Sequence, residues 1–374
     1  MINKRPILAL SAAMALVLAS CGSNGTPPAA SSSGTDSGGI SGTQTSSAPQ
    51  GGNLTWVSFG GKFQDDQIEA WQKPITDATG ITFDNVSPYD NAQLAAMVQA
   101  GKTVWDVTTP GGTFASIHCG DLYEKLEPGV VDPDDFVDGS TAGDCSAPAY
   151  VFANIFSYDA DADVFKNEVP TKIEDFFDTK KFPGKRVLYD SENVGYYEAA
   201  LVADGVDPKD LYPLDLDRAF KKLDTIKDSI IFAPTLGAAG QALTDKQGVM
   251  TLLVTARTVT TALAGVNLVP VWDFTTYAPG VVTIAKGSPN VDLANKAIKA
   301  MLTKESAIKY AELTGTGPAL KGISASEIKY DPVQAKFNAF DDTQERGTVI
   351  AQDTQWAAQN YDTLTKRWNE WKIG

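Results

Sequence analysis

The sequence has little cysteine and almost no histidine. Its 374 residues include three cysteines and a single histidine, His118. Catalytic triads and most acid–base pairs need a histidine, and neither the G-x-S-x-G motif nor the G-x-x-x-x-G-K-[ST] motif occurs. We therefore expect no enzyme and no cofactor. A secreted hydrolase that uses two separated carboxylates stays open, because spacing in the sequence cannot reveal such a pair.

Positive charge is also scarce, with 31 Lys and Arg against 46 Asp and Glu, a formal net charge of −15. Nucleic-acid binding depends on clustered Lys and Arg, so it is not expected. An acidic surface suits a soluble protein whose ligand is neutral, zwitterionic or cationic. The 16 Phe, 12 Tyr and 7 Trp exclude a disordered chain, and the length suits two packed α/β lobes.

Long apolar runs are missing except near the N-terminus. Residues 7–18 form an apolar stretch after two positive charges, which is typical of a signal peptide and too short for a permanent transmembrane helix. The following LASCG resembles a bacterial lipobox, which predicts that residues 1–20 are removed and that Cys21 carries a lipid. An ordinary secretory signal is the alternative. Residues 21–51 are rich in Gly, Ser and Thr and predict a disordered tether.

The other two cysteines, Cys119 and Cys145, form an even pair in an oxidising compartment, which predicts a disulfide. The bond would close an acidic, glycine-rich loop and stabilise the fold by about 3–4 kcal/mol in the chain-entropy model. A metal site that includes His118 is the alternative. Its spacings do not match zinc patterns, so no metal is expected.

From residue 53 onward, apolar segments of strand and helix type alternate, which predicts a doubly wound α/β fold. The expected strands are 54–59, 81–86, 104–108, 187–189, 230–232, 249–254, 268–272 and 281–285. Pro74 is expected to kink one helix, and Asn91 to cap the next. A final helix is expected to bury a stripe of aromatic and aliphatic residues, Tyr361, Leu364, Trp368 and Trp371.

Four blocks of sequence carry a resemblance to a known family: LTWVSFGG at 54–61, NAQLAAMVQAGKTVWDVTTPGGTF at 91–114, KKFPGKRVLYDSENVGYYEAAL at 180–201, and QWAAQNYDTLTKRWNEW at 355–371. In order and spacing they resemble the extracellular solute-binding proteins of ABC importers, in the branch of the spermidine/putrescine-binding proteins. The resemblance implies a two-lobed periplasmic-binding-protein fold of type II, with a hinge and a central ligand cleft. Lobe one would comprise residues 52–154 plus 280–325, and lobe two 155–279 plus 326–374.

Loops at the carboxyl ends of the strands are the expected ligand contacts, because ligands of open α/β sheets bind there. The resemblance implies contacts from the loop after the first strand. The loop after the third strand could cup a polar group with its backbone amides. The acids that follow the 187–189 strand could hold an amine. The candidates are Ser58, Phe59, Gly60, Gly111, Gly112, Thr113, Asp190, Glu192 and Tyr196. The alternatives are a core phenylalanine, a plain turn and solvated acids.

The expected ligand differs from a pure polyamine. Where polyamine binders place an aromatic and an aspartate, this sequence has Pro279 and Val281. Arg257 follows a buried strand, and its fork of donors suits a carboxylate. We therefore expect a small amine, either a polyamine or an amine that also bears an acid, such as γ-aminobutyrate. Pairing of Arg257 with a neighbouring acid is the alternative.

Three more residues complete the predicted site. Tyr277 could offer an aromatic face to an ammonium, and Asp353 and Trp356 lie where the family's second lobe adds a late polar contact. Tyr196 and Tyr197 resemble the adjacent tyrosines of ferric-ion binders, which gives a metal-transport alternative. A surface adhesin is a further alternative.

The sequence thus predicts an extracytoplasmic, lipid-anchored, monomeric receptor that delivers its ligand to an ABC permease in the membrane.

Overall fold

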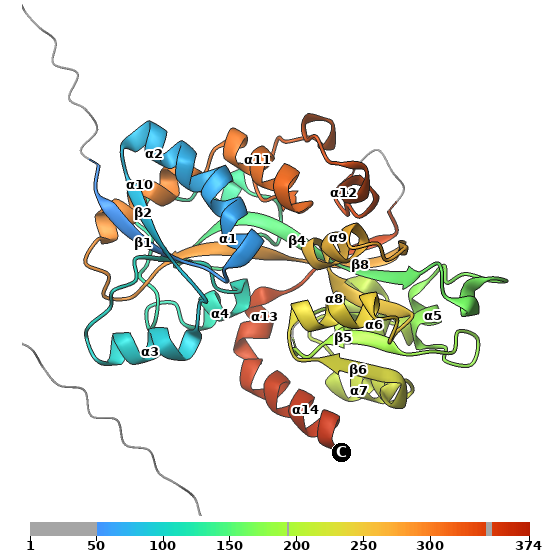
Figure 1. Cartoon of the computed structure of the whole chain (residues 1–374). Helices are drawn as coiled ribbons and strands as arrows, with labels where there is room; N and C mark the ends of the chain where they lie inside the picture. Colours follow the sequence, from blue (N-terminus) through green and yellow to red (C-terminus); the bar gives the residue numbers. More distant parts are fainter. Residues whose placement is uncertain (1–50, 193, 342–345) are drawn as a thin grey trace, which may run out of the picture. The chain divides into compact units, whose positions relative to one another are not determined.

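The computed structural model describes residues 51–192, 194–341 and 346–374, and these form one mixed sheet with helices on both of its faces (Figure 1). The predicted signal peptide, the lipid site at Cys21 and nearly all of the tether lie outside the described residues. The α/β class predicted from the alternating pattern is confirmed.

Ten strands are found in the described residues, in the order β2-β1-β3-β8-β4-β7-β5-β6, with β10 beside β8 and β9 beside β4. They are β1 Asn53–Val57, β2 Thr82–Val86, β3 Val107–Thr108, β4 Ser146–Asp159, β5 Arg186–Tyr189, β6 Ile230–Ala233, β7 Met250–Val254, β8 Leu268–Ile284, β9 Gly317–Pro318 and β10 Thr348–Ala351. Strands β1–β3 are mutually parallel, as are β5–β7, whereas β8 is antiparallel to β3 and β4.

The helices of the described residues are α1 Gly61–Gln67, α2 Lys73–Thr79, α3 Asn91–Gln99, α4 Gly112–Ile117, α5 Ile173–Phe177, α6 Tyr196–Ala203, α7 Leu216–Asp224, α8 Leu236–Thr244, α9 Thr255–Leu263, α10 Val291–Met301, α11 Lys304–Thr314, α12 Pro332–Lys336, α13 Thr354–Gln359 and α14 Tyr361–Ile373. The expected kink at Pro74 is replaced by a π-helical turn, Ile68–Gln72, after which Pro74 occupies the first turn of α2. The side chain of Asp90, not Asn91, caps α3.

The strands β4 and β8 form a long antiparallel pair, and sequence analysis did not foresee it. The segments 268–272 and 281–285 were expected as two strands, but they belong to one strand, β8, and β4 was not predicted. Pro279 and Gly280 hid this continuity, because both residue types normally interrupt strands. Position 280 requires glycine, because the ring of Tyr150 lies only 2.0 Å from where a Cβ atom would stand.

Two large hydrophobic cores lie toward opposite ends of the sheet. The core at the β1–β3 end contains Trp56 and Trp71 and includes residues of α10 and α11. The core at the β5–β7 end contains Phe156 and Trp368. The predicted stripe of the last helix is buried at its centre, since Leu364 and Trp368 are each 2% exposed.

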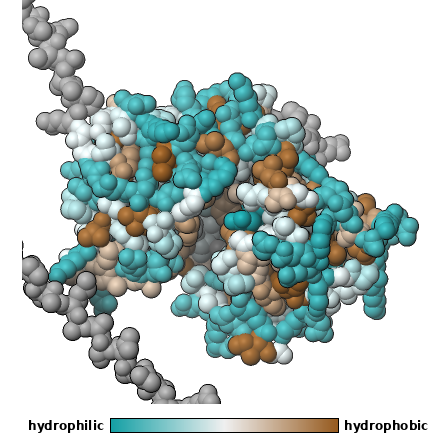
Figure 2. Space-filling model, in the orientation of Figure 1, coloured by the Kyte–Doolittle hydropathy of each residue, from teal (hydrophilic) through white to brown (hydrophobic). Residues whose placement is uncertain are grey.

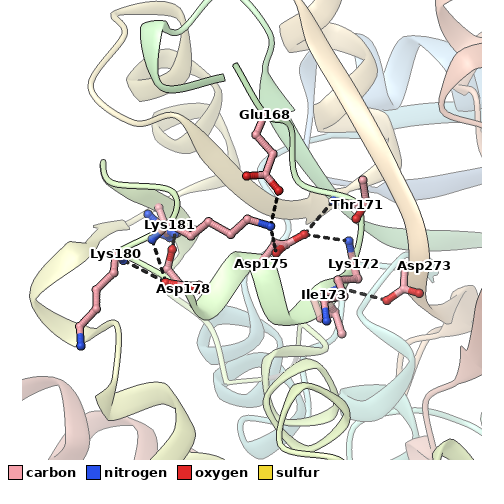
Figure 3. A network of polar contacts seen from close by, with 10 residues as sticks. Glu168, Thr171, Lys172, Ile173, Asp175, Asp178, Lys180, Lys181 and Asp273 are labelled. Carbon is pink, nitrogen blue, oxygen red and sulfur yellow. Dashed lines mark hydrogen bonds and ion pairs between the residues drawn. The ribbon is translucent and has the colours of Figure 1, made fainter. Parts of the chain in front are cut away.

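A polar network secures the segment that leads into β5 (Figure 3). Lys181 Nζ lies 2.6 Å from Glu168 Oε1 and 3.4 Å from Asp175 Oδ1, and the other oxygen of Asp175 accepts a hydrogen bond from Thr171 N. Arg186, the first residue of β5, is buried, and its guanidinium donates to the backbone carbonyls of Phe176, Asp178, Phe182 and Gly184. These contacts hold the start of β5 against the segment that precedes it.

A disulfide bond joins Cys119 to Cys145, with an S–S distance of 2.06 Å. Cys145 is fully buried at the start of β4, beside Tyr123 and Val281. The bond therefore ties the chain after α4 to the amino end of β4.

Candidate functional site

The strands at the β1 end of the sheet lead toward the middle of β8. Thr108, the last residue of β3, pairs with Thr283 of β8. The chain then continues to an isolated bridge between Gly111 and Gly280. Because β1 and β3 are parallel, the loops that follow both strands lie at this same edge.

The strands at the β5 end approach the same place from the opposite direction. Val254, the last residue of β7, pairs with Asn154 of β4, which pairs in turn with Thr276 of β8. Residues 276–280 of β8 thus separate the two sets of carboxyl ends, a span of about 13 Å at the usual rise of a strand. Figure 2 shows a hollow here, between α1 and α4 on one side and α8 on the other.

The loop after β1 places one aromatic ring in solvent. Ser58 is fully buried, whereas Phe59 is 54% exposed and lies with its ring 5.8 Å from that of Phe63 and 5.7 Å from that of Tyr89. Gly60 is the N-cap of α1. Burial raises the pKa of Tyr89 to about 12, so its phenol stays neutral. The exposed ring of Phe59 is the member of this loop that could contact a ligand.

The loop after β3 becomes the start of α4. Gly111 is the N-cap of this helix, and Gly112 and Thr113 are its first two residues and are buried. A Cβ atom at Gly112 would lie 3.0 Å from Pro279, so this turn packs directly on β8. The predicted turn is therefore part of the surface between the two strand sets.

Arg257 was expected in a loop, but it lies in the first turn of α9, because that helix begins directly after β7. Its Nε atom is buried without a hydrogen-bond partner, and no salt bridge to Arg257 is found within the described ranges. A Cβ atom at Gly240 of α8 would lie 3.0 Å from Cδ of Arg257, so the side chain packs closely between the two helices. Burial lowers the pKa of the guanidinium. The predicted alternative, a pairing with a neighbouring acid, is absent from the described residues.

The acids expected after β5 contact the last helix. Asp190 Oδ1 accepts hydrogen bonds from Trp368 Nε1 at 2.8 Å and from Lys372 Nζ at 2.5 Å. Glu192 Oε1 accepts a bond from Thr365 Oγ1 at 3.3 Å. These carboxylates are occupied by α14, which the sequence could not show, because the partners lie about 180 positions later in the chain.

Tyr196 belongs to the core. It is 2% exposed, donates to Tyr189 O and stacks on Trp368 with ring centroids 5.5 Å apart. Tyr197 is equally buried and packs edge to face against Phe220. Nowhere in the described part of the chain do three or more His, Cys, Asp or Glu side chains form a group that could hold a metal ion.

The last three predicted residues each have a contact of their own. The hydroxyl of Tyr277 donates to Asp138 O, and its side chain lines a cavity of about 470 Å³. Asp353 caps α13 by accepting from Trp356 N and lines a second cavity of about 890 Å³. Trp356 packs on Tyr212 with ring centroids 5.7 Å apart. Neither cavity is lined by Arg257 or Phe59.

Sequence analysis missed a buried polar group whose partners, Tyr212 and Gln352, line the second cavity. Glu198 of α6 accepts bonds from Tyr212 Oη at 2.6 Å and from Gln352 Nε2 at 3.1 Å. Gln352 Oε1 in turn accepts from Asn154 Nδ2 at 3.3 Å. A carboxylate between Tyr197 and the apolar run AALVA at 199–203 was the available signal, since such a position is rarely acidic without a partner.

Comparison with known proteins identifies relatives over most of the chain. The family model described as bacterial extracellular solute-binding protein matches residues 70–336. The chain is 31% identical to the gamma-aminobutyric acid-binding protein of Pseudomonas aeruginosa over 332 residues. This match covers 86% of this chain and 91% of that protein.

Solved structures are also similar to this chain over most of its length. The Atu4243-GABA receptor is 33% identical, with a TM-score of 0.75, and covers 86% of this chain and 98% of its own. An ABC transporter substrate-binding protein from Bradyrhizobium japonicum is 26% identical, with a TM-score of 0.72, and covers 85% and 99%. No helix in the described part of the chain combines the length and the apolar character needed to cross a membrane.

Proposed function

This chain belongs to the bacterial extracellular solute-binding protein family, and we propose that it captures a small amine that also carries a carboxylate, such as γ-aminobutyrate, for an ABC permease. It holds the solute and does not alter it. The relatives that are named for binding γ-aminobutyrate support this choice over a polyamine.

The observation that carries the proposal is the state of Arg257. The described part of the chain contains other arginines with clear partners, such as Arg186 with its carbonyls and Arg218 with Asp204. Arg257 has a buried Nε atom without a partner and a pKa lowered by burial. A buried N–H group without a partner is costly, and a ligand carboxylate would remove that cost through two parallel hydrogen bonds with the guanidinium.

The amine end would lie toward residues 276–280 of β8. The exposed ring of Phe59, on the far side of these residues, would cover the amine when the lobes close, and a π face attracts an ammonium by about 0.5–2 kcal/mol. The distance of about 13 Å between the two strand sets accommodates a four-carbon ω-amino acid together with the side chains that hold it.

Capture would use two lobes that close on the solute. We assign residues 52–154 plus 280–325 to one lobe and 155–279 plus 326–374 to the other. The two cores support this division, because α10 and α11 contribute to the core with Trp56, and α14 to the core with Phe156. The β4–β8 pair would be the hinge. Contacts that the solute makes only when the lobes are closed would stabilise the closed state.

The setting of the protein is part of the same proposal. Cleavage before Cys21 and lipidation of that residue would anchor a monomer outside the cytoplasm. A coil of the length of residues 21–51 reaches roughly 30 Å, so the receptor could reach a permease while tethered.

Replacement of Arg257 by alanine tests the carboxylate contact. In a thermal-shift assay γ-aminobutyrate should raise the melting temperature of the wild type, while Arg257→Ala should melt normally without ligand and show a much smaller rise at the same ligand concentration. The loss follows from removal of a charge-assisted pair, which is equivalent to an affinity decrease of about tenfold to a hundredfold.

Arg218→Ala is the matched control, because it removes an arginine of an exposed salt bridge and should keep the full ligand-induced rise. An Arg257→Ala protein that binds γ-aminobutyrate as tightly as the wild type would show that this arginine is structural.

A further inference from the structure

A directional chain of hydrogen bonds ends at Asn154, where β4 pairs with Thr276 of β8. It begins at the Glu198 carboxylate, which is 3% exposed and has no salt-bridge partner in the described residues. Gln352, 5% exposed, donates to it through Nε2, and Asn154, fully buried, donates to Gln352 Oε1 through Nδ2.

The carboxylate fixes the orientation of both amides. Glu198 can only accept from Gln352, so Gln352 must turn its NH2 group toward Glu198 and its oxygen toward Asn154. Asn154 must then donate, and its Nδ2 uses both hydrogens, one to Gln352 Oε1 and one to Thr276 Oγ1 at 2.9 Å. The oxygen of Asn154 is left at the end of the chain.

Asn154 Oδ1 is a buried acceptor without a hydrogen-bond partner. An unmade bond at a buried carbonyl destabilises the fold, so such an atom calls for a donor. The carboxylate behind it keeps this position negative, which favours a cationic donor over a neutral one.

Asn154 and Arg257 lie at the same edge of the sheet. The Cα partner of Asn154 in β7 is Val254, three residues before Arg257. Their Cα atoms are therefore at most about 15 Å apart, from the spacing of two strands plus three residues. This separation is comparable to the length of an extended ω-amino acid together with the two side chains that would hold it.

We propose that Asn154 Oδ1 accepts a hydrogen bond from the ligand's ammonium, and that Glu198 and Gln352 are positioning residues that orient it. The inference rests on the proposed function and adds to it the group that selects the amine. Glu198 acts through Gln352 and does not touch the solute.

The test compares γ-aminobutyrate with butyrate, which lacks the amine, by isothermal titration, with butyrate measured by competition. Glu198→Gln lets Gln352 and Asn154 reverse, so that Asn154 presents an NH2 group to the ammonium. It should weaken γ-aminobutyrate binding about tenfold or more and leave butyrate binding within about twofold. Gln352→Met breaks the chain at a second point and should give the same selective loss.

Asp159→Asn is the matched control, because Asp159 is a buried carboxylate farther along β4 that is paired with Lys246. It should leave both affinities unchanged. Unchanged γ-aminobutyrate affinity in Glu198→Gln and Gln352→Met, or an equal loss for both ligands, would overturn the inference. A wild type that binds neither ligand would instead contradict the proposed function.

Discussion

His118, the only histidine of the sequence, lies at the carboxyl end of α4 with its ring 4.2 Å from that of Phe114. Burial lowers its pKa from the usual 6.5, although nearby Asp121 acts in the opposite direction. The folded chain therefore binds a proton at His118 less readily than the unfolded chain does.

This residue predicts a pH dependence of stability. The contribution of neutral His118 is complete above pH 6.5 and is lost as pH falls from 6.5 toward its lower folded pKa, because the unfolded state then binds more protons. When the pH is lowered from about 7.5 to about 5.5, the melting temperature should fall more for the wild type than for His118→Gln. Equal decreases in the two proteins would assign the acid sensitivity to carboxylates.

Single residues also show where sequence reasoning about the site ended. The fork of Arg257 suggested a carboxylate partner from residue chemistry alone, and its buried, unpartnered Nε atom supports that interpretation. Asp190 and Glu192 were equally plausible as ligands for an amine. Their pairing with Lys372 and Thr365 depends on where α14 packs, which no local pattern reveals.

At the scale of elements, the segment from Cys119 to Cys145 has little regular structure of its own. It contains a three-residue 3₁₀ turn, Pro133–Asp135, and several exposed acids. Its ends are held by the disulfide and by the buried phenol of Tyr123, which hydrogen-bonds Tyr89 at 2.5 Å. Isolated bridges of Tyr123 with Ala285 and of Phe136 with Leu320 also hold the segment, and the disulfide adds a covalent restraint to them.

Removal of the disulfide should destabilise the fold without changing it. The two cysteines are separated by 26 positions, so Cys119→Ser with Cys145→Ser should lower the free energy of unfolding by about 3–4 kcal/mol in the chain-entropy model. Urea denaturation measures this loss. As a control, dithiothreitol should destabilise the wild type to a similar extent and leave the double variant unchanged. A double variant as stable as the oxidised wild type would contradict the prediction.

Elements were predictable where their periodicity was simple. Helix α6 was expected at residues 196–203, where it is found. The β4–β8 pair was missed because β4 carries Pro148 and β8 carries Pro279 and Gly280, and only their packing with each other and with Tyr150 makes these residues compatible with strands. Register between distant strands is a tertiary property, so the middle of the sheet could not be deduced locally.

At the scale of the whole molecule, the order of four sequence blocks was enough to predict the solute-binding family. Asn154 and Gln352 lie outside these blocks. Glu198 lies inside the third block, but next to an apolar run, where nothing marks it as part of a ligand site. The family could be predicted because many residues along the chain contribute to its sequence pattern. The selectivity of the cleft depends on few side chains, and their positions follow from β4, α6 and the segment after β10.

The account's central claim is that one solute binds both Arg257, through its carboxylate, and Asn154, through its ammonium. Isothermal titration of the wild-type chain with γ-aminobutyrate, butyrate and putrescine tests it most directly, with the solute recovered afterwards and checked by NMR. We predict that γ-aminobutyrate binds at least about tenfold more tightly than either single-function analogue, as expected if each end of the solute is held by a charge-assisted contact, and that it is recovered unchanged. Tighter binding of putrescine, or chemical conversion of the solute, would contradict the account.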